Sequence, residues 1–170
     1  FKWHKIINSN NTFIIKTKTD LISENFKNKN FITLKAKDAI VDQIFDIKNS
    51  RPSISKLNPD FYIHLIIKKN KLKVYLNSSG KPLFMRGYKT KIHKASLNES
   101  LASGIIQLSN WQPNMPLYDF MCGSGTICIE AAMQAFNIPA NIMRENFSFF
   151  NWNDFDYQLW NDLKKEAKKK

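Results

Sequence analysis

The feature that most restricts what this chain can fold into is residues 117–126, where a short apolar run meets a glycine turn and a helix. The segment is Leu-Tyr-Asp-Phe-Met-Cys-Gly-Ser-Gly-Thr. Residues 117–120 predict a short strand ending near Asp119, and apolar residues at helical spacing predict a helix over 126–136. Gly123 and Gly125 permit a tight turn and a close approach of the backbone to a ligand. A lone Gly-x-Gly is common in tight turns, but strand, acid, turn and helix in this order indicate a binding site.

The chemistry of this segment suits a ligand that carries both signs of charge. The first turn of a helix presents unpaired N–H groups and a partial positive charge, which favour an anion. Asp119, at the carboxyl end of the expected strand, can accept a hydrogen bond from an ammonium or a hydroxyl group. A ligand with a carboxylate and an ammonium fits this arrangement, and S-adenosylmethionine has both.

Charge is divided unevenly along the 170 residues. Residues 1–94 hold 20 Lys and Arg against 6 Asp and Glu, whereas residues 95–170 hold 6 against 8, which together give the net charge of +12. A strongly basic half beside a nearly neutral one predicts two modules, the first of which faces a polyanion such as nucleic acid. The alternative is a solvated basic surface, because an A/T-biased genome also produces a composition rich in Lys and Asn.

The candidate phosphate-binding residues lie in or beside the expected elements of the basic half. They are Lys16, Lys18, Lys35, Lys37, Arg51 and Arg86. Arg86 is the strongest candidate, because a guanidinium can pair with phosphate and stack on a base, and Gly87 permits close approach. The alternative is that Arg86 is a linker residue paired to a carboxylate such as Asp60.

Residue periodicity places the elements of the basic half. Strands are expected at 12–18, 61–68 and 71–77, and an amphipathic helix is expected at 35–47. Residues 25–30 predict a polar loop. The dipeptide Lys69-Asn70 predicts the turn of a hairpin with one buried and one more polar face.

The second half predicts helices separated by loops. A helix is expected from residue 97 to about 109, with Ser96 as its N-cap and Glu99 completing a capping box. A last helix is expected near 154–168, after an aromatic loop at 147–152. In that loop Phe149, Phe150 and Trp152 are expected to pack under the last helix, with stacking on a base as the alternative.

Three other side chains of the second half are expected in the core. Tyr118 and Phe120 are assigned to the interior of a sheet, and Cys128 to the buried side of its helix. Cys122 lacks a nearby His partner, so a catalytic thiol is not expected.

Cysteine, histidine and hydropathy patterns narrow the function classes. Two cysteines make no disulfide framework or zinc spacing, so a reducing, cytoplasmic location is expected. The three histidines lack metal-ligand spacing. No stretch approaches the roughly 18 apolar residues that cross a bilayer, and no leader segment is recognised, so no membrane partner is expected.

A resemblance to a known family rests on motifs spread along nearly the whole chain. The run Asp-Phe-Met-Cys-Gly-Ser-Gly-Thr at 119–126, followed by Ile-Glu-Ala-Ala at 129–132, resembles the first motif of class I RNA methyltransferases that carry a THUMP domain. The similarity extends to residues 37–42, 51–52, 58–60, 86–88, 97–102, 111–113 and the Trp152 to Trp160 region. The most similar group is the bacterial large-subunit (23S) ribosomal RNA guanine-N2 methyltransferases, which older naming sometimes calls adenine-specific DNA methylases.

The resemblance implies a fold and a site that the residues alone do not establish. It implies an α/β fold in which residues 1–88 form a THUMP-like RNA-binding domain and residues 89–170 begin a Rossmann-like methyltransferase domain. It also implies that the methionine end of S-adenosylmethionine is held by six matching residues. These are Asp119, Cys122, Gly123, Ser124, Gly125 and Thr126.

The chain departs from the family pattern in ways that bear on activity. Phe120 stands where the family has Pro, no Asn-Pro-Pro-Tyr motif occurs, and the acid that holds the cofactor ribose is missing. Only 51 residues follow Asp119, too few for the remaining strands of the sheet. A fragment, a truncated gene product or a split enzyme is therefore expected, completed by its missing remainder or by another copy. The absence of Met at position 1 favours a fragment.

Three functions follow from these observations. The first is the RNA-binding and cofactor-entry portion of a ribosomal RNA methyltransferase, which is inactive on its own because it lacks the catalytic motif. The second is a stand-alone RNA-binding module with a vestigial glycine turn. The third is a fragment of a DNA adenine methyltransferase, against which the THUMP-like half argues.

Overall fold

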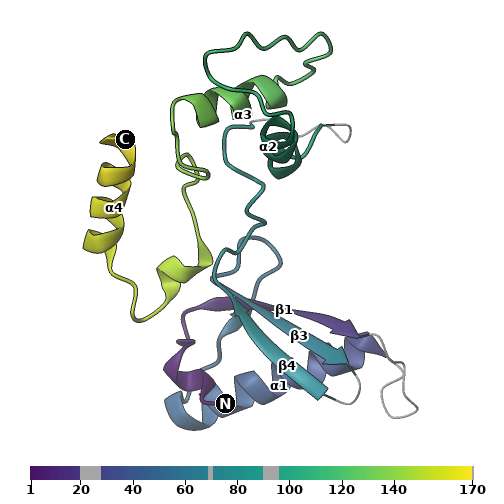
Figure 1. Ribbon diagram of the computed structural model, residues 1–170. Helices are drawn as coiled ribbons and strands as arrows, with labels where there is room; N and C mark the ends of the chain where they lie inside the picture. The colour runs from purple at the N-terminus through teal and green to yellow at the C-terminus, as the bar shows by residue number, and fades with distance from the viewer. Residues whose placement is uncertain (20–27, 69–70, 90–95, 170) are drawn as a thin grey trace. The chain divides into compact units, whose positions relative to one another are not determined.

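The structure is a computed structural model, and it describes residues 1–19, 28–68, 71–89 and 96–169. The chain divides into two compact units (Figure 1). Unit 1 comprises residues 1–80 and 147–155, and unit 2 comprises residues 81–146 and 156–170. The sequence placed one boundary between residues 88 and 89. In the structure the chain instead leaves unit 1 after residue 80, returns at 147 and leaves again after 155.

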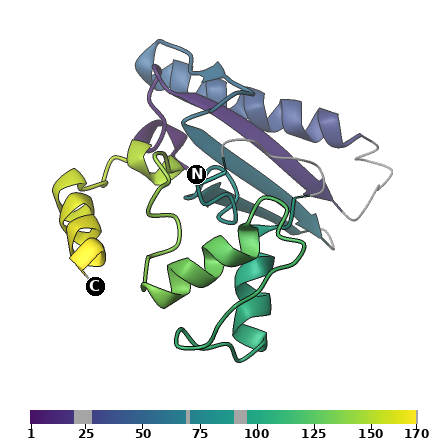
Figure 2. The same cartoon turned by 90° about the horizontal axis from the view of Figure 1, so that it is seen from above.

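Unit 1 is a four-stranded sheet with one long helix. The strands are β1 (Thr12–Thr19), β2 (Ser53–Ile54), β3 (Phe61–Lys68) and β4 (Lys71–Asn77), in the spatial order β2-β1-β3-β4. β1 is parallel to β2 and to β3, and β3 is antiparallel to β4. The helix α1 (Lys29–Lys48) lies along one face of the sheet (Figure 2), and a short 3-10 helix, η1 (Trp3–Lys5), precedes β1.

Helix α1 is longer than the expected 35–47. Asn28 caps it by accepting a hydrogen bond from the Asn30 backbone N–H, so part of the expected polar loop at 25–30 belongs to the helix. Asn49 ends it with a φ of 51°, which Asn tolerates better than most residues. The rest of that loop, and the expected turn at Lys69-Asn70, lie outside the described residues.

The core of unit 1 lies between α1 and the sheet. Every second residue of β1 and β3 faces it, and α1 contributes a buried stripe from its second half. The largest fully buried apolar side chains are Phe13, Phe61, Ile7, Ile44 and Ile63. This alternation is the pattern that the sequence predicted for 12–18 and 61–68.

Strand β4 differs from the expected half-buried strand. Leu72 and Val74, which share the face of the core, are 57% and 39% exposed. β4 is the edge strand beyond β3, whereas α1 packs over β1. The prediction that Leu72 and Val74 share one face was correct, but α1 does not cover the edge strand β4 on that face.

The aromatic segment at 147–155 belongs to unit 1. In η2 (Ser148–Asn151) the Ser148 hydroxyl donates to the Asp60 carbonyl at 2.5 Å, and the Phe149 N–H donates to the Ser78 carbonyl at 2.9 Å. Trp152 packs against the unit 1 core. Backbone groups at the ends of β3 and β4 therefore bind this segment to unit 1, which the expected packing under the last helix did not anticipate.

Unit 2 contains the helices α2 (Glu99–Leu108), α3 (Thr126–Ala135) and α4 (Tyr157–Lys169). Ala102 and Ile106 of α2 are buried, as are Ala131 and Met133 of α3, and α2 and α3 are in contact. The N-cap of α2 is Asn98, which accepts from the Leu101 N–H, and not Ser96. The helix therefore begins two residues later than expected.

The strand expected at 117–120 is not formed. Tyr118 is 75% exposed and Phe120 is 93% exposed, so neither lies in a sheet core. The described residues of unit 2 include no strand that could pair with this segment, and a strand needs a neighbour for its backbone hydrogen bonds. Cys128 is exposed on α3, which also corrects the expectation that it is buried.

Among the described residues, no helix is both long enough and apolar enough to cross a membrane.

Candidate functional site

The glycine turn opens α3 as the sequence predicted. Gly123 and Gly125 have φ values of +53° and +70°, in the left-handed region that favours glycine. The Gly125 N–H donates to the Cys122 carbonyl at 2.7 Å, which closes the turn. Gly125 is itself the N-cap of α3, so the turn leads directly into the helix.

The first turn of α3 keeps its backbone donors available. Its N-cap is a glycine without a side-chain acceptor, and no acidic residue lies in its first turn. By contrast, Asn28 caps α1 and Asn98 caps α2 through their side chains, and α2 also carries Glu99 in its first turn. Free N–H groups together with the helix dipole suit an anionic group such as a carboxylate.

The six expected cofactor residues lie around this turn. The Asp119 carboxylate accepts from the Met121 N–H at 3.2 Å, and the hydroxyls of Ser124 and Thr126 are 3.1 Å apart. Thr126 is buried at 3% exposure, whereas Cys122, Gly123 and Ser124 are exposed. The glycine turn is therefore open to solvent, and the candidate cofactor residues are gathered at the start of α3.

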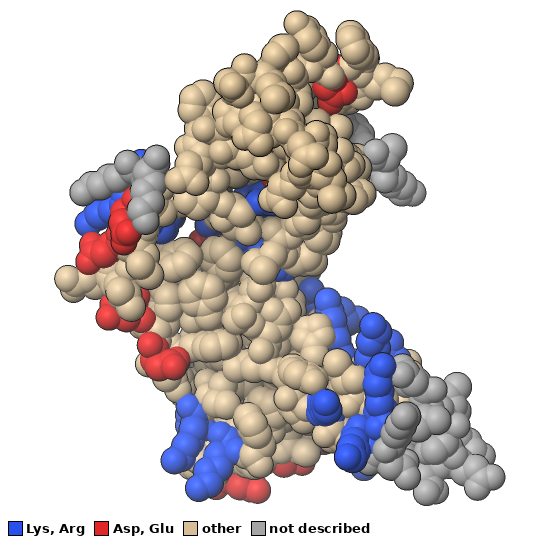
Figure 3. Space-filling view, viewed as in Figure 1, with Lys and Arg blue, Asp and Glu red and all other residues tan. Residues whose placement is uncertain are grey.

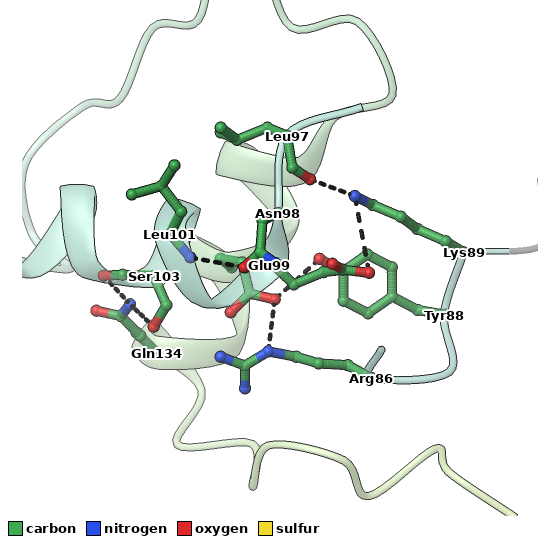
Figure 4. A network of polar contacts seen from close by, with 10 residues as sticks. Arg86, Tyr88, Lys89, Leu97, Asn98, Glu99, Leu101, Ser103 and Gln134 are labelled. Carbon is green, nitrogen blue, oxygen red and sulfur yellow. Dashed lines mark hydrogen bonds and ion pairs between the residues drawn. The ribbon is translucent and has the colours of Figure 1, made fainter. Parts of the chain in front are cut away.

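A buried ionic network lies beside α3 in unit 2 (Figure 4). Glu130, 1% exposed, accepts a hydrogen bond from the Tyr88 hydroxyl at 2.8 Å and lies 3.1 Å from the Arg86 Nε. Lys89 Nζ lies 3.7 Å from Glu99 Oε1 and donates to the Leu97 carbonyl at 2.6 Å. The contact of Arg86 with Glu130 lacks hydrogen-bond geometry at Nε, so it is an ion pair rather than a hydrogen bond.

The network balances two cations against two carboxylates, and all four side chains are largely buried. Burial is the main cause that raises the pKa of Tyr88 well above its usual range, and the hydrogen bond to Glu130 adds to it. The phenol is therefore a permanent donor. Glu130 comes from α3, Glu99 from α2, and the cations come from residues 86–89, so the network joins that connector to both helices.

This arrangement corrects the assignment of Arg86 as a phosphate contact. Its side chain is 11% exposed and forms an ion pair with Glu130. Arg86 is therefore a linker residue paired to a carboxylate, as in the alternative, but the carboxylate is Glu130 and not Asp60. Gly87 does permit a close approach, but of the Met143 backbone: a Cβ on Gly87 would lie 2.9 Å from the Met143 carbonyl oxygen. Sequence reasoning identified both motifs of this network separately, and only folding could show that they pair.

A second candidate site is the face of the unit 1 sheet opposite α1, which we call the open face. Strand register aligns its side chains in rows across β1, β3 and β4. One row holds Lys16, His64 and Tyr75, and the next holds Lys18, Ile66 and Lys73. Tyr62 and Lys68 of β3, and Lys71 of β4, complete the polar part of the face.

The expected phosphate-binding residues fall on opposite sides of unit 1. Lys16 and Lys18 are exposed on the open face, whereas Lys35 and Lys37 project from α1 on the other side. Arg51 follows α1, lies 3.8 Å from Asp42 and covers the Phe45 ring. One RNA strand lying on the sheet could contact the first pair but not the others.

Three lysines were missed by the sequence-based selection. Lys68, Lys71 and Lys73 lie on β3 and β4 and share the open face with Lys16 and Lys18. The signal was present, because Lys71, Lys73 and Tyr75 alternate with apolar residues. Their pairing with β1 required the sheet order.

The pKa of His64, in the middle of the open face, is sensitive to the positive charge of that face. Burial lowers the pKa of His64, and the nearby positive charge of Lys16 lowers it further. The Asn77 amide nitrogen lies 3.4 Å from the His64 Nε2. A neutral imidazole therefore lies among the lysines near neutral pH.

Two family models match the chain, and together they cover nearly all of it. A family model described as a THUMP domain matches residues 1–77, and one described as RMKL-like, methyltransferase domain matches residues 86–170. The chain belongs to the RMKL-like methyltransferase family. This confirms the family and the mixed α/β fold class that the motifs indicated.

Individual relatives agree with this membership. The chain is 43% identical over 145 residues to the ribosomal RNA large subunit methyltransferase K/L of Psychromonas ingrahamii, a match that covers 85% of this chain and 19% of that protein. The crystal structure of SMU.472, a methyltransferase by its description, in complex with SAH shares 32% identity and a TM-score of 0.79 over 98% of this chain and 44% of that chain. A Listeria monocytogenes protein described as a predicted N6-adenine-specific DNA methylase shares 26% identity and a TM-score of 0.80 over 99% and 43% of the two chains. The chain thus spans less than half the length of these relatives.

Proposed function

We propose that this chain is the RNA-binding and cofactor-entry portion of an S-adenosylmethionine-dependent methyltransferase that modifies large-subunit ribosomal RNA. The observation that carries the cofactor assignment is the start of α3, which has no side-chain cap and follows two left-handed glycines. Asp119 lies seven residues before Thr126, the first residue of the helix. The N–H groups hold a carboxylate and Asp119 accepts from an ammonium, so the methionine end of the cofactor fits. The bound cofactor supplies a methyl group on a sulfonium centre.

The printed descriptions of the relatives support the reaction and the substrate. One relative is described as a large-subunit ribosomal RNA methyltransferase, and another contains SAH, which is what S-adenosylmethionine becomes after losing its methyl group. The finer assignment, to the N2 amine of a guanine, rests on the resemblance of the motifs to the guanine-N2 group. DNA is the competing substrate class, because the Listeria protein is described as a DNA methylase.

The cofactor site is tested by NMR titration of the labelled chain with SAH at millimolar concentration. Amides from Ser124 to Cys128 should shift, and 5′-methylthioadenosine, which lacks the amino-acid end, should leave them unchanged. Affinity should be weak because the acid that holds the ribose is missing. Equal shifts with both ligands, or shifts confined to other residues, would contradict the assignment.

Catalysis and substrate class are tested separately. The chain mixed with ribosomal RNA and labelled S-adenosylmethionine should transfer no methyl group, since it has no Asn-Pro-Pro-Tyr motif. In a binding assay, RNA should compete for the chain better than DNA of the same sequence. Methyl transfer by the purified chain would refute the first expectation, and preferential binding of DNA would refute the second.

A further inference from the structure

We propose that the open face of the sheet is a platform for single-stranded RNA, on which bases stack while lysines hold the phosphates. The inference rests on the proposed function, which makes RNA the partner, and adds the surface, the strandedness and the residues. Figure 3 shows Lys and Arg side chains gathered over the strands of unit 1. The other side of the unit, formed by α1, serves as the internal comparison.

Charge distinguishes the two sides of unit 1. The open face carries five lysines, and the three strands that form it contain no Asp or Glu. They are Lys16, Lys18, Lys68, Lys71 and Lys73. Helix α1 carries Asp38, Asp42 and Asp46 among its lysines, and Lys37 lies 2.7 Å from Asp38. A polyanion is therefore attracted to the sheet more strongly than to the helix.

The geometry of the sheet distributes these charges along a path. Successive residues on one face of a strand lie about 6.6 Å apart, and neighbouring strands lie about 4.8 Å apart. Rows that contain Lys16, then Lys18 with Lys73, then Lys68 with Lys71 thus follow one another along the strands. An extended backbone that runs along this direction meets a positive charge at each step.

Aromatic side chains at one end of the path suit unpaired bases. Tyr75 is 47% exposed, and Tyr62 lies in the adjoining row with the Lys16 ammonium 5.9 Å from its ring centre. Aromatic rings on an exposed sheet stack on bases that are splayed out of a helix, and bases inside a duplex are not available for this. Rings and lysines on one flat face therefore favour a single strand over a duplex.

The test compares two charge-matched double variants by fluorescence anisotropy with a labelled single-stranded RNA. Lys16→Glu with Lys73→Glu replaces two positive charges on the open face by negative ones, and Lys35→Glu with Lys37→Glu does the same on α1. The first should weaken binding at least tenfold and lower the log–log salt slope by about 1.4, since each single-strand contact contributes about 0.7. The second should weaken binding less than about threefold through the change of net charge alone.

The stacking component has its own variant. Tyr75 lies on the exposed edge strand β4, and Tyr75→Ala should weaken binding of the single strand about fivefold or more. The salt slope should not change, because the substitution removes no charge. A duplex of the same sequence should bind the wild-type chain more weakly than the single strand. Circular dichroism of every variant checks that the fold is kept.

The outcomes separate the platform from the proposed function. If the wild-type chain binds no RNA at moderate salt, the proposed function fails as far as RNA is concerned. If it binds RNA but the α1 pair weakens binding as much as the sheet pair, or the duplex binds more tightly, the platform is wrong and the RNA assignment stands. If Lys16→Glu with Lys73→Glu does not fold, Lys16→Gln with Lys73→Gln is used in its place. This variant should lose less RNA affinity, but still more than the α1 pair.

Discussion

Unit 1 and unit 2 differ in how fully their strand-forming segments find hydrogen-bond partners and in how fully their apolar side chains are buried. In unit 1 each of the four strands has a hydrogen-bonded neighbour, and Phe13 and Phe61 are fully buried. In unit 2 the described residues form helices and loops, and Phe120 and Met121 are each 93% exposed. An apolar run therefore forms a strand only where a partner strand can hydrogen-bond to its backbone.

Hydrogen exchange should show the largest difference between the units. Amides in β1 and β3 should exchange about a hundredfold or more slowly than those in α2 and α3, because local opening of a helix pair with little core costs less free energy. Exchange measured by NMR in a dilute monomeric sample checks this. Uniformly slow exchange across 96–169 would mean that unit 2 is stable as it stands.

Two aromatic truncations, one in each unit, should differ strongly in their effect on the free energy of unfolding. Phe61→Ala should lower the free energy of unfolding of unit 1 by about 3–5 kcal/mol, because it leaves a cavity in a fully packed core. Phe120→Ala should change that of unit 2 by less than about 0.5 kcal/mol, since the ring is in water. Chemical denaturation followed through signals of each unit distinguishes them. A comparable cost for both would show that Phe120 is buried in solution.

The buried network should be the main stabilising feature of unit 2. Glu130→Gln leaves Arg86 buried without a carboxylate and should cost about 3 kcal/mol, which is enough to abolish the α2 and α3 signals while unit 1 stays folded. The control is Asp162→Asn, which breaks an exposed pair with Lys165 and should cost less than about 0.5 kcal/mol. Retention of α2 and α3 in Glu130→Gln would show that the ion pair is not needed.

Local patterns predicted most of unit 1 because its periodicities agree with its contacts. The alternation in 12–18 and 61–68 marks the residues that the core buries, and Asn28 and Asn49 explain where α1 starts and ends. The return of residues 147–155 to unit 1 could not be predicted. It depends on the hydrogen bonds that Ser148 and Phe149 make to backbone carbonyls far away in the sequence.

The candidate site was predictable to the extent that it is contiguous. The glycine turn and its helix follow from residues 121–136 alone, since φ preferences, helical spacing and helix ends are local. Arg86 and Glu130 are separated by 44 residues, so no local pattern shows that they pair. The same holds for Lys16 and Lys73, which share a face only through the position of β3 between β1 and β4.

Substituting glycine by alanine at two positions of unit 2 should change its free energy of unfolding in opposite directions. Gly125→Ala places a Cβ at a φ of +70° and should cost about 1 kcal/mol or more. Gly104→Ala lies within α2, where a Cβ meets nothing within 4 Å, and should stabilise the helix by roughly 0.5–1 kcal/mol. Thermal unfolding monitored at α2 and α3 compares them. Equal signs would show that the left-handed turn is not kept in solution.

The smallest expected effect is the titration of His64, which links the open face of unit 1 to its stability. Because burial and Lys16 hold the pKa of His64 below its usual value, the unfolded chain takes up a proton at a higher pH than the folded chain does. The free energy of unfolding of unit 1 should therefore decrease as the pH falls through the usual histidine range, and the loss should be complete below the lowered pKa. NMR titration of the ring should show the pKa rising in Lys16→Gln and staying constant in Lys35→Gln. It should also rise when single-stranded RNA binds, because phosphates near the ring favour its charged form. A His64 pKa that responds to Lys16→Gln but not to bound RNA would place the RNA away from the open face.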